Sequence, residues 1–389
     1  MTVSARQSVR KKFAVRHFTN ITTTCPFNRA ELTRWLDSGK CKQAQMVRRI
    51  LAADSDVITC SYYLKHKQGR LIPYPWPNFT FLNRGARAIA AIDTRMIDID
   101  IINAHMSITA NIGAMCGMSR ADLATLLEYN ENREDVLRAL MQETRCDRDA
   151  VKELFLIILY CDSELTWARE HSVKCSKKLL AVTKPMRQQL KAVRQTAIAS
   201  FMRADCADDD NIFAGIASSA KTKLSAHDIE KKRWSRLCMH FERAALLEIC
   251  KVAQSATYSC DVCQLLYDGA QIRPPLPGTP RRAGDNARHA PGMFALRDLE
   301  SDVDVALATV AGMTHYPLHV KCKPFQLPDA YLAKKREMFL LDQLRLMAGI
   351  DSGSDRMNLL TEIMHPPKSV AQMLWGPDGL DPIANSHVL

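Results

Sequence analysis

Two short apolar segments that carry carboxylates lie far apart in the chain, and they constrain the fold more than any other feature. The first is a predicted strand over residues 96–102, in which Asp98 and Asp100 alternate with isoleucines. The second is a predicted hairpin over residues 262–273 with Asp268-Gly269 at its turn. Helical patterns dominate the sequence between them, over about residues 103–116, 120–129, 132–143, 147–162, 183–203 and 227–254. Asp147 and Ser225 are suited to cap the helices that follow them. Further helices are predicted over about residues 328–348, 356–364 and 368–375. This order predicts a sheet built from distant parts of the chain, with a helical lobe inserted between its strands.

The acid-bearing strand indicates a cation site. Alternation along a strand places Asp98 and Asp100 on one face and Ile97, Ile99 and Ile101 on the other. A carboxylate between apolar neighbours is costly to bury unless it binds a cation or hydrogen-bond partners. Mg²⁺ favours carboxylate oxygens together with substrate phosphates. The alternatives are a half-exposed edge strand with solvated acids and, for Asp268, an ordinary hairpin turn.

A predicted helix over residues 147–162 carries the second motif, Arg148-x3-Lys152-x7-Tyr160. At about 100° per residue, the three side chains fall within roughly a third of the helix circumference, and Phe155 lies on the same side. Two cations followed by an aromatic ring suit a nucleoside triphosphate lying along the helix. The alternative is an amphipathic helix with a solvated basic edge.

The charge balance also points to a polyanionic partner. Among 389 residues, Lys and Arg number 53 and Asp and Glu number 42, so the formal net charge is +11. A positive chain is drawn to nucleic acid or to an anionic membrane surface. No apolar run is long enough to span a bilayer, and no secretory signal is visible.

The cysteines and the N-terminus concern the compartment. The 13 cysteines are scattered, which favours free thiols in a reducing intracellular compartment. Cys260 and Cys263 form the one close pair, and without a second pair for zinc we expect both to be packing residues. Residues 1–26 look poorly ordered and basic. They resemble a mitochondrial transit peptide or a flexible arm for nucleic acid, and both readings stay open.

Together, the three motifs resemble motifs A, B and C of the family A DNA polymerases and the phage-type single-subunit RNA polymerases. The carriers are Asp-Ile-Asp-Ile-Ile-Asn-Ala-His over residues 98–105, Arg148-x3-Lys152-x7-Tyr160, and Leu-Leu-Tyr-Asp-Gly over residues 265–269. The wording is most similar to divergent members from viruses or mobile elements. The resemblance covers residues 80–325.

The resemblance implies two-metal nucleotidyl transfer. It makes Asp98 and Asp268 ligands of two Mg²⁺ ions, with Mn²⁺ as a substitute, and Asp100 becomes a further candidate ligand on the same strand face. Such ions lower the pKa of a primer 3′-hydroxyl and steady the leaving pyrophosphate.

It also implies roles for the nucleotide-binding residues. Arg148 and Lys152 match the triphosphate-binding cations, and Lys152 is in addition a candidate acid for the leaving group. Tyr160 matches the aromatic residue that closes over the nascent base pair. Asn103 falls where family members sense the sugar 2′ position, although it is equally suited to cap the helix that begins there.

Two residues depart from the family pattern. Tyr160 is followed by Cys161 where the family has glycine, and Asp268 is followed by Gly269 where DNA polymerases often carry a second acid. These departures leave open a catalytically inactive nucleic-acid-binding protein.

The expected fold is therefore α+β and mostly helical: a right-hand polymerase with a small antiparallel palm sheet and an inserted helical fingers lobe. The expected activity is that of a DNA-directed DNA polymerase, with an RNA polymerase or primase of the same fold as the alternative. The expected partners are a nucleic-acid template, a primer and nucleoside triphosphates, and no membrane. The predicted divisions are an N-terminal arm (1–26), a helical and hairpin region (27–94), a first palm segment (95–118), fingers (119–225), a second palm segment (226–325) and a C-terminal helical region (326–389).

Overall fold

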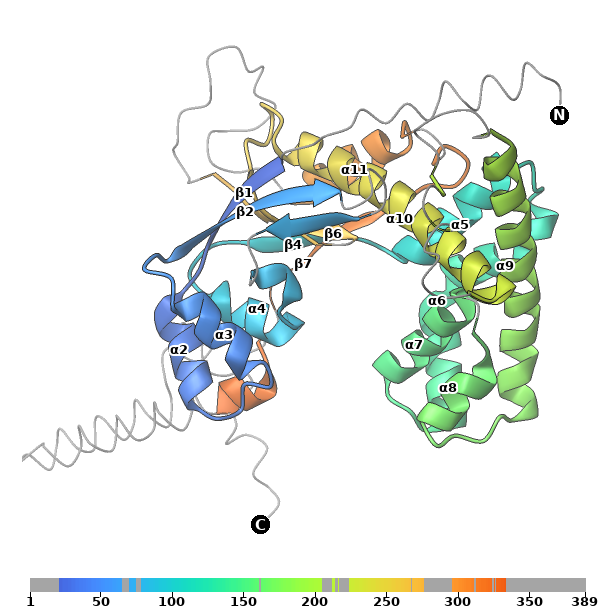
Figure 1. Cartoon of the computed structure of the whole chain (residues 1–389), viewed down its shortest axis with the longest axis horizontal. Coiled ribbons are helices and arrows are strands. Elements are labelled where there is room, and N and C mark those ends of the chain that lie inside the picture. The colour runs from blue at the N-terminus through green and yellow to red at the C-terminus, as the bar shows by residue number, and fades with distance from the viewer. Residues whose placement is uncertain are drawn as a thin grey trace, which may run out of the picture. The chain divides into compact units, whose positions relative to one another are not determined.

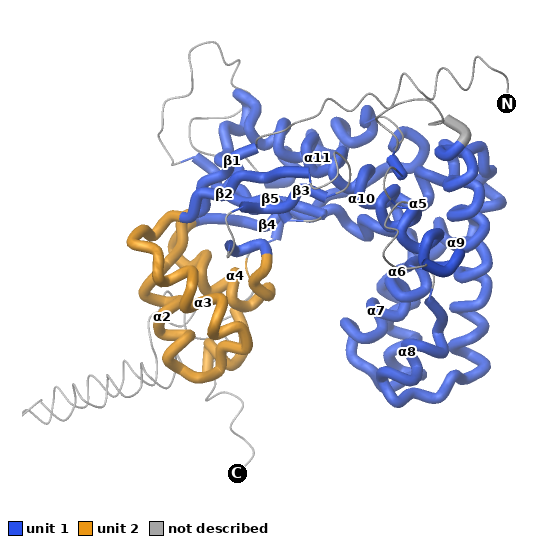
Figure 2. Tube along the Cα trace, viewed as in Figure 1, with its two compact units in different colours: residues 1–25, 58–80, 95–324 blue, residues 26–57, 81–94, 325–389 orange. Residues whose placement is uncertain are grey.

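A computed structural model describes residues 21–64, 70–74, 78–160, 162–204, 212–213, 216, 224–266, 268–275, 296–310, 313–323, 325 and 327–333. The fold is α+β and mostly helical with small antiparallel sheets, as predicted (Figure 1). The chain divides into two compact units (Figure 2). The larger unit comprises residues 1–25, 58–80 and 95–324, and the smaller comprises residues 26–57, 81–94 and 325–389.

A four-stranded sheet in the larger unit unites the two acid-bearing segments, which confirms that aspect of the prediction. Its order is β5-β6-β4-β7, and each neighbouring pair is antiparallel. The strands are β4 (Ile97–Ile101), β5 (Asp261–Leu265), β6 (Gly269–Arg273) and β7 (Val320–Lys323). Ile99 and Ile101 of β4 are buried, and this apolar face secures the central strand in the core.

Two helices hold this sheet. Helix α5 (Ala104–Met115) follows β4 directly and is apolar around most of its circumference, so Ala104 and every residue from Met106 to Gly113 are buried. Helix α10 (Ala226–Ala253) contacts α5, β5 and β6. It begins with a capping box in which Ser225 and Asp228 satisfy each other's backbone N–H groups, as the sequence predicted. Helix α11 (Leu296–Leu307) contacts α10 and β7.

The insertion between β4 and β5 is helical, as predicted, but its details differ. Residues 120–129 and 132–143 were expected as two helices, whereas a 3₁₀ turn (Ala121–Leu123) leads into one helix, α6 (Ala124–Thr144), with non-helical backbone angles at Asn132. Helix α7 (Arg148–Leu159) starts at the predicted cap Asp147, and α9 spans Lys177–Ala204. Helix α8 (Glu164–Glu170) was not predicted. It is too short for a periodic signal, and the buried Trp167 secures it by donating to Ala150 O at 2.8 Å.

The first sheet corrects the expectation that residues 1–26 form only a flexible arm. Its last six residues are strand β1 (Ile21–Pro26), which lies beside β2 (Val57–Leu64), and β3 (Leu71–Tyr74) follows on the other side of β2. The run Ile21-Thr22-Thr23-Thr24 is β-branched and favours a strand, and Thr23 and Cys25 are buried. The predicted hairpin of β2 and β3 is confirmed, while its turn lies outside the described residues.

The smaller unit is helical. It contains α2 (Arg29–Asp37), α3 (Ala44–Leu51) and α4 (Arg84–Ala90), and a 3₁₀ turn (Phe79–Phe81) precedes α4 at its boundary. Tyr331 donates a hydrogen bond to the buried Glu31 and packs edge-on against Trp35, at 6.1 Å between ring centroids. The predicted helices over 328–348, 356–364 and 368–375 lie outside the described residues, apart from a start at 329–333.

Within the described ranges, no helix is both long and apolar enough to cross a membrane. Cys260 and Cys263 are buried in and beside β5, in agreement with their predicted packing role.

Candidate active site

Asp100 and Asp268 lie at the same end of the β4–β6 pair. The Cα of Asp100 lies opposite that of Gly269, and the backbone N–H of Ile101 donates to the Asp268 carbonyl at 3.0 Å. Asp268 itself sits in the tight turn between β5 and β6, where Leu266 N–H donates to Gly269 O at 2.9 Å. Backbone hydrogen bonds from two directions therefore fix the position of Asp268 relative to β4.

Gly269 is required by the close approach of these strands. A Cβ atom at this position would lie 2.2 Å from the Ile99 carbonyl oxygen and 2.5 Å from Oδ1 of Asp100. The Asp100 carboxylate thus lies directly over the residue that follows Asp268. The departure from the family pattern at Gly269 has a local steric reason, since no side chain fits there without moving β4.

Asp98 lies two residues deeper along β4, in a different environment. It is only 5% exposed, and its Oδ1 accepts a hydrogen bond of 3.1 Å from the amide of Gln271 on β6. Asp100 is half-buried, and Lys323 of β7 approaches its Oδ2 to 3.3 Å. Asp98 is therefore held by a neutral partner inside the sheet, whereas Asp100 is at the sheet end beside Asp268.

The donor set at this sheet end fits a magnesium ion. Among the residues that the structure describes, no group of three or more His, Cys, Asp or Glu side chains converges on a metal position. Magnesium is commonly held by one or two carboxylates with substrate phosphates and water completing its shell, so Asp100 and Asp268 offer the expected protein share. In the described part of the chain, the Asp268 carboxylate has no ion pair or side-chain hydrogen bond.

Helix α7 presents a row of side chains spaced four residues apart. Arg148 and Leu156 are exposed and Lys152 is half-buried between them, and Tyr160 follows the last helical residue as its C-cap. Leu156 was not singled out from the sequence, although its i+4 spacing from Lys152 marks it as part of this face. Phe155 does not lie on it, because that ring is buried and packs against Tyr129 at 4.3 Å.

Both cations of α7 are already paired. Arg148 donates twice to Glu134 of α6, at 2.6 and 3.2 Å, and this bidentate contact lowers the pKa of Glu134. Lys152 lies 3.6 Å from Asp149, which is exposed. The Lys152–Asp149 pair is of the exposed kind that contributes little, whereas the bidentate geometry makes the Arg148–Glu134 pair the stronger of the two.

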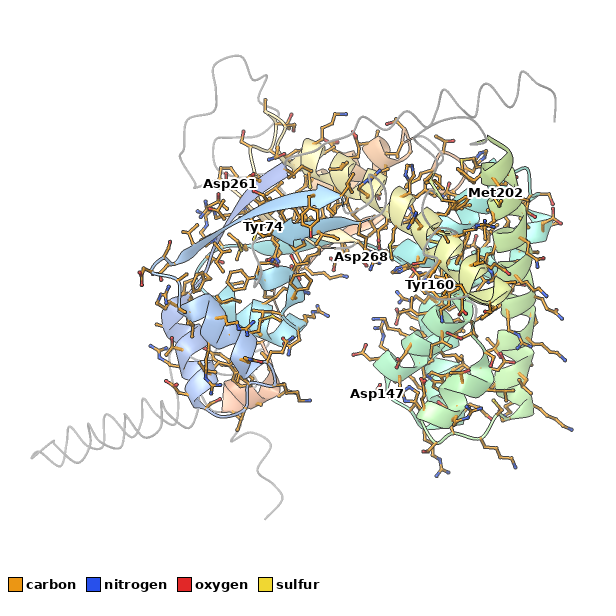
Figure 3. All side chains as sticks on the ribbon, in the orientation of Figure 1. Tyr74, Asp147, Tyr160, Met202, Asp261 and Asp268 are labelled. Carbon is orange, nitrogen blue, oxygen red and sulfur yellow. The ribbon has the colours of Figure 1, made fainter. Side chains whose placement is uncertain are left out.

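A buried group of side chains surrounds Tyr160, and the sequence did not reveal it. The ring of His105 on α5 packs edge-on against Tyr160 with centroids 5.9 Å apart, and His105 Nε2 lies 3.5 Å from Glu242 of α10. Arg70 makes a bidentate ion pair with Glu242 at 2.7 and 3.2 Å. Burial raises the pKa of Tyr160, and the carboxylates of Glu242 and Asp268 add to that shift. Tyr160 and Asp268 are both labelled in Figure 3, the first after the last residue of α7 and the second in the turn between β5 and β6.

Asn103 does not cap α5 with its side chain, which corrects that alternative. Its backbone is left-handed, with φ of 53° and ψ of 32°, and the side chain makes no capping hydrogen bond. Instead, its amide donates to the Asn130 carbonyl at 3.5 Å, and its buried Oδ1 has no partner among the described groups. The left-handed backbone explains why Asn is accommodated between β4 and α5, since Asn tolerates positive φ better than most residues.

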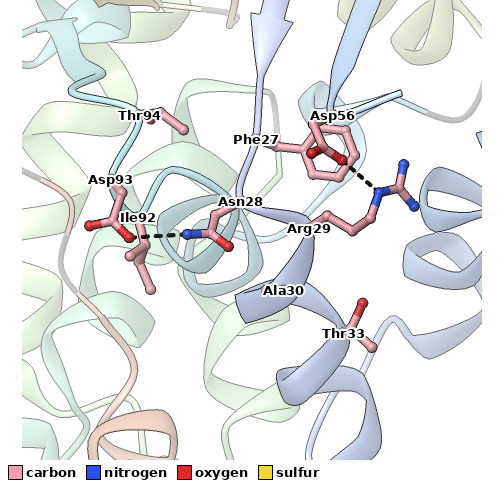
Figure 4. A pocket seen from close by; sticks show the side chains of 9 residues that line it. All are labelled: Phe27, Asn28, Arg29, Ala30, Thr33, Asp56, Ile92, Asp93 and Thr94. Atoms are coloured by element: carbon pink, nitrogen blue, oxygen red, sulfur yellow. Dashed lines mark hydrogen bonds and ion pairs between the residues drawn. The ribbon is translucent and has the colours of Figure 1, made fainter. Parts of the chain in front are cut away.

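A pocket of about 670 Å³ lies in the smaller unit (Figure 4). Its polar side chains are occupied: Asn28 donates to Asp93 at 3.1 Å, and Arg29 binds Asp56 at 2.6 Å. Arg29 also donates to three backbone carbonyls. These contacts tie the start of α2 to its neighbouring loops, which is a structural role.

Comparison with known proteins yields only a distant likeness. No protein-family model matches the chain, and no curated protein sequence matches it. Among solved structures, the chain is similar to the POL domain of Pol1 from M. smegmatis in complex with DNA primer-template and dNTP, with a TM-score of 0.46 and 13% sequence identity. The match covers 74% of this chain and 51% of that chain, so this chain spans about half the length of the structure it matches.

Proposed function

We propose that the chain is a template-directed nucleotidyltransferase, and that its reaction is DNA-directed DNA synthesis. The observation that carries the proposal is the meeting of Asp100 and Asp268 at one end of the β4–β6 pair, where Gly269 leaves room for the Asp100 carboxylate. Two carboxylates fixed by a sheet and opened to ligands at its end suit a divalent cation that a substrate phosphate completes.

In this proposal, Asp100 and Asp268 hold the metal ions, and Asp98 supports them from inside the sheet. Bound magnesium would lower the pKa of a primer 3′-hydroxyl and offset charge on the phosphates. Asp98 is the less suited ligand because it is almost fully buried and bonded to Gln271. Its burial next to a neutral amide instead suits a carboxylate that orients β6.

The row on α7 supports nucleotide binding. Lys152 and Tyr160 are eight residues apart, so they lie about 12 Å apart along the helix axis. The phosphates would replace Asp149 and Glu134 as partners of Lys152 and Arg148, and the base and sugar would then reach Tyr160 near Asp268. The cations supply positioning and electrostatic stabilisation without a covalent intermediate.

The proposed lobes follow from this assignment. The β5-β6-β4-β7 sheet is the palm, and the insertion from α6 to α9 is the fingers, as in a right-hand polymerase. Template and primer would contact Lys and Arg through their phosphates, independently of sequence. The chain's net charge of +11 supports such a partner.

A primer-extension assay with Mg²⁺, supplied separately with dNTPs and with NTPs, tests the proposal. We expect extension with dNTPs, abolished by chelation and restored by Mg²⁺ or Mn²⁺. Incorporation of NTPs alone would redirect the assignment to an RNA polymerase or primase. Metal-independent binding of primer-template without extension, under every condition, would leave only a nucleic-acid-binding protein.

A further inference from the structure

Glu242 is a buried carboxylate with two partners from other segments of the larger unit. Its side chain is only 3% exposed, and both oxygens face Arg70, which precedes β3. Oε1 also faces His105 Nε2 on the first turn of α5. Three segments that are distant in sequence therefore meet on one carboxylate of α10.

Stability alone does not explain this arrangement, because a buried ion pair contributes little to the free energy of folding. Removing two charges from water costs several kcal/mol, and their mutual attraction often does no more than offset that cost. Apolar residues of similar volume would hold β3, α5 and α10 together at least as well. The bidentate geometry does supply direction, since it fixes the Arg70 guanidinium in one plane.

The contacts of Glu242 extend toward the proposed nucleotide site. His105 occupies the space between Glu242 and Tyr160, and its ring stands edge-on to the tyrosine at an interplanar angle of 79°. The charge of Asp268 raises the pKa values of both Tyr160 and Glu242, so the acid turn lies within electrostatic reach of each. Glu242 thus connects through the His105 side chain to the ring of Tyr160.

We propose that Glu242 is a positioning residue of the nucleotide site, which holds Arg70 and His105 and thereby fixes the ring of Tyr160 at the end of α7. The positioning of Arg70, His105 and Tyr160 by Glu242 follows from the contacts in the structure alone. The half that concerns nucleotides rests on the proposed function. Glu242 touches no substrate in this role and acts only through its two neighbours.

The proposal predicts that the position of Tyr160 changes with pH as Glu242 gains or loses its proton. Arg70 and His105 face Glu242 directly, and the charge of Asp268 adds to the rise in the pKa of Glu242 without a contact. Burial raises the pKa of Glu242 to about 7, with Arg70 opposing the rise. Burial and Arg70 lower the pKa of His105 to about 4, so His105 stays neutral across this range. Glu242 is therefore ionised above about pH 7 and holds Arg70 there, and protonation below that pH weakens the hold.

A probe on the ring itself tests the geometric half without any activity. The protein is labelled with 3-fluorotyrosine, and Tyr160→Phe identifies the fluorine resonance of Tyr160. We expect this resonance to shift with a midpoint near pH 7 in the wild type, and to lose that midpoint in Glu242→Gln. Glu248→Gln is the matched control on the same helix, where Glu248 pairs with Lys251. If Glu242→Gln does not fold, Arg70→Lys is measured instead, because it keeps the charge but loses the bidentate contact with Glu242. A Tyr160 resonance that is unchanged from the wild type in a folded variant overturns the proposal.

Nucleotide binding tests the other half. We expect Glu242→Gln to weaken binding of a fluorescent dNTP by about tenfold, equivalent to about 1.4 kcal/mol, while binding of primer-template is unchanged. In extension assays the loss should appear in KM more than in kcat. A lower melting temperature with unchanged dNTP affinity and an unchanged resonance would make Glu242 a structural residue only. If the wild type itself neither binds nor extends, the proposed function fails, while the resonance still reports on the positioning.

Discussion

The sheet end at Asp100 and Asp268 and the exposed face of α7 carry opposite charges and differ in how firmly each is held. The sheet end is fixed by backbone hydrogen bonds between β4 and β6, and Gly269 permits the close approach of these strands. The cations of α7 extend from an exposed helix face, and each is paired with an exposed acid. The backbone of the sheet end is preorganised, although a metal ion there would displace Lys323 from Asp100. The cations of α7 extend from a helix face and must exchange their partners.

In the proposed site, the sheet end would bind metal ions and the face of α7 would bind the triphosphate. A metal site gains from carboxylates that need no rearrangement, because the cation must find its ligands in place. A triphosphate site must bind and then release its product, so weak pairs that are easily displaced suit it. Substitutions at the sheet end should therefore act on catalysis, and those on α7 should act on nucleotide affinity.

The sharpest test of this contrast is removal of the acids. Asp268→Asn and Asp100→Asn should each reduce primer extension by about 10³-fold or more, because each removes a charge that the ions require. Asp98→Asn should cost less, since the amide oxygen can still accept the hydrogen bond from Gln271. Extension rates at saturating Mg²⁺ give the ranking. Asp261→Asn, an exposed acid of the same hairpin (labelled in Figure 3), is the control and should remain active.

A greater loss in Asp98→Asn than in Asp100→Asn would move the metal site two residues deeper into β4. Near wild-type extension in Asp268→Asn would break the assignment of this sheet end altogether.

Gly269→Ala tests whether the sheet end is as rigid as the geometry implies. The added Cβ would meet the Ile99 carbonyl and the Asp100 carboxylate, so β4 and β6 must separate. We expect a loss of about 3 kcal/mol in unfolding free energy, together with a loss of extension. Chemical denaturation measures the first. Gly39→Ala, in the smaller unit, has open space around it but a positive φ, and its smaller loss calibrates backbone strain alone.

The sequence predicts the backbone elements of both regions. The alternation of Asp98 and Asp100 with isoleucines, the Asp-Gly turn, and the caps at Asp147 and Ser225 are local signals, and each element they predicted is present. From the sequence we expected Asp98 to be the metal ligand ahead of Asp100. The opposite proposal depends on the register with β6, which the sequence does not specify because both acids occupy the same face.

Contacts between distant segments were also beyond the sequence. Arg70, His105 and Glu242 are ordinary residues in their own segments, and no spacing links them before the chain folds. A left-handed backbone at Asn103 and the partner of its amide are likewise set by how β4 meets α6.

Lys152→Ala tests whether the exposed face of α7 binds the nucleotide. We expect KM for dNTPs to rise by about tenfold, or about 1.4 kcal/mol, with unfolding free energy almost unchanged because the side chain is paired with an exposed acid. Template affinity and its salt dependence should stay as in the wild type. Steady-state kinetics and a salt titration of template binding separate these quantities. An equal loss of template affinity would place this face in the nucleic-acid track.

Glu134→Gln should act in the opposite direction and more weakly. It releases Arg148 from its bidentate partner, so Arg148 becomes free for phosphate. Exposed ion pairs contribute little, so KM for dNTPs should fall by only about two- to threefold, and raised salt should erase the difference. Glu131→Gln, which removes the neighbouring pair with Arg120, should leave KM unchanged. A rise in KM would show that the pair with Glu134 orients Arg148 instead of withholding it.

The smallest expected effect concerns Asn103, which stands between the two regions, after β4 and against α6. Its left-handed backbone predicts that Asn103→Gly leaves stability unchanged or slightly higher, whereas Asn103→Ala costs about 1 kcal/mol. If the half-buried amide also screens the sugar 2′ position, Asn103→Gly should raise incorporation of NTPs relative to dNTPs by a few-fold, without the loss of stability that Asn103→Ala carries. Parallel melting curves and single-nucleotide incorporation with each sugar measure both quantities. An unchanged sugar ratio in both variants would leave Asn103 with a backbone role alone, because its amide then serves only the Asn130 carbonyl.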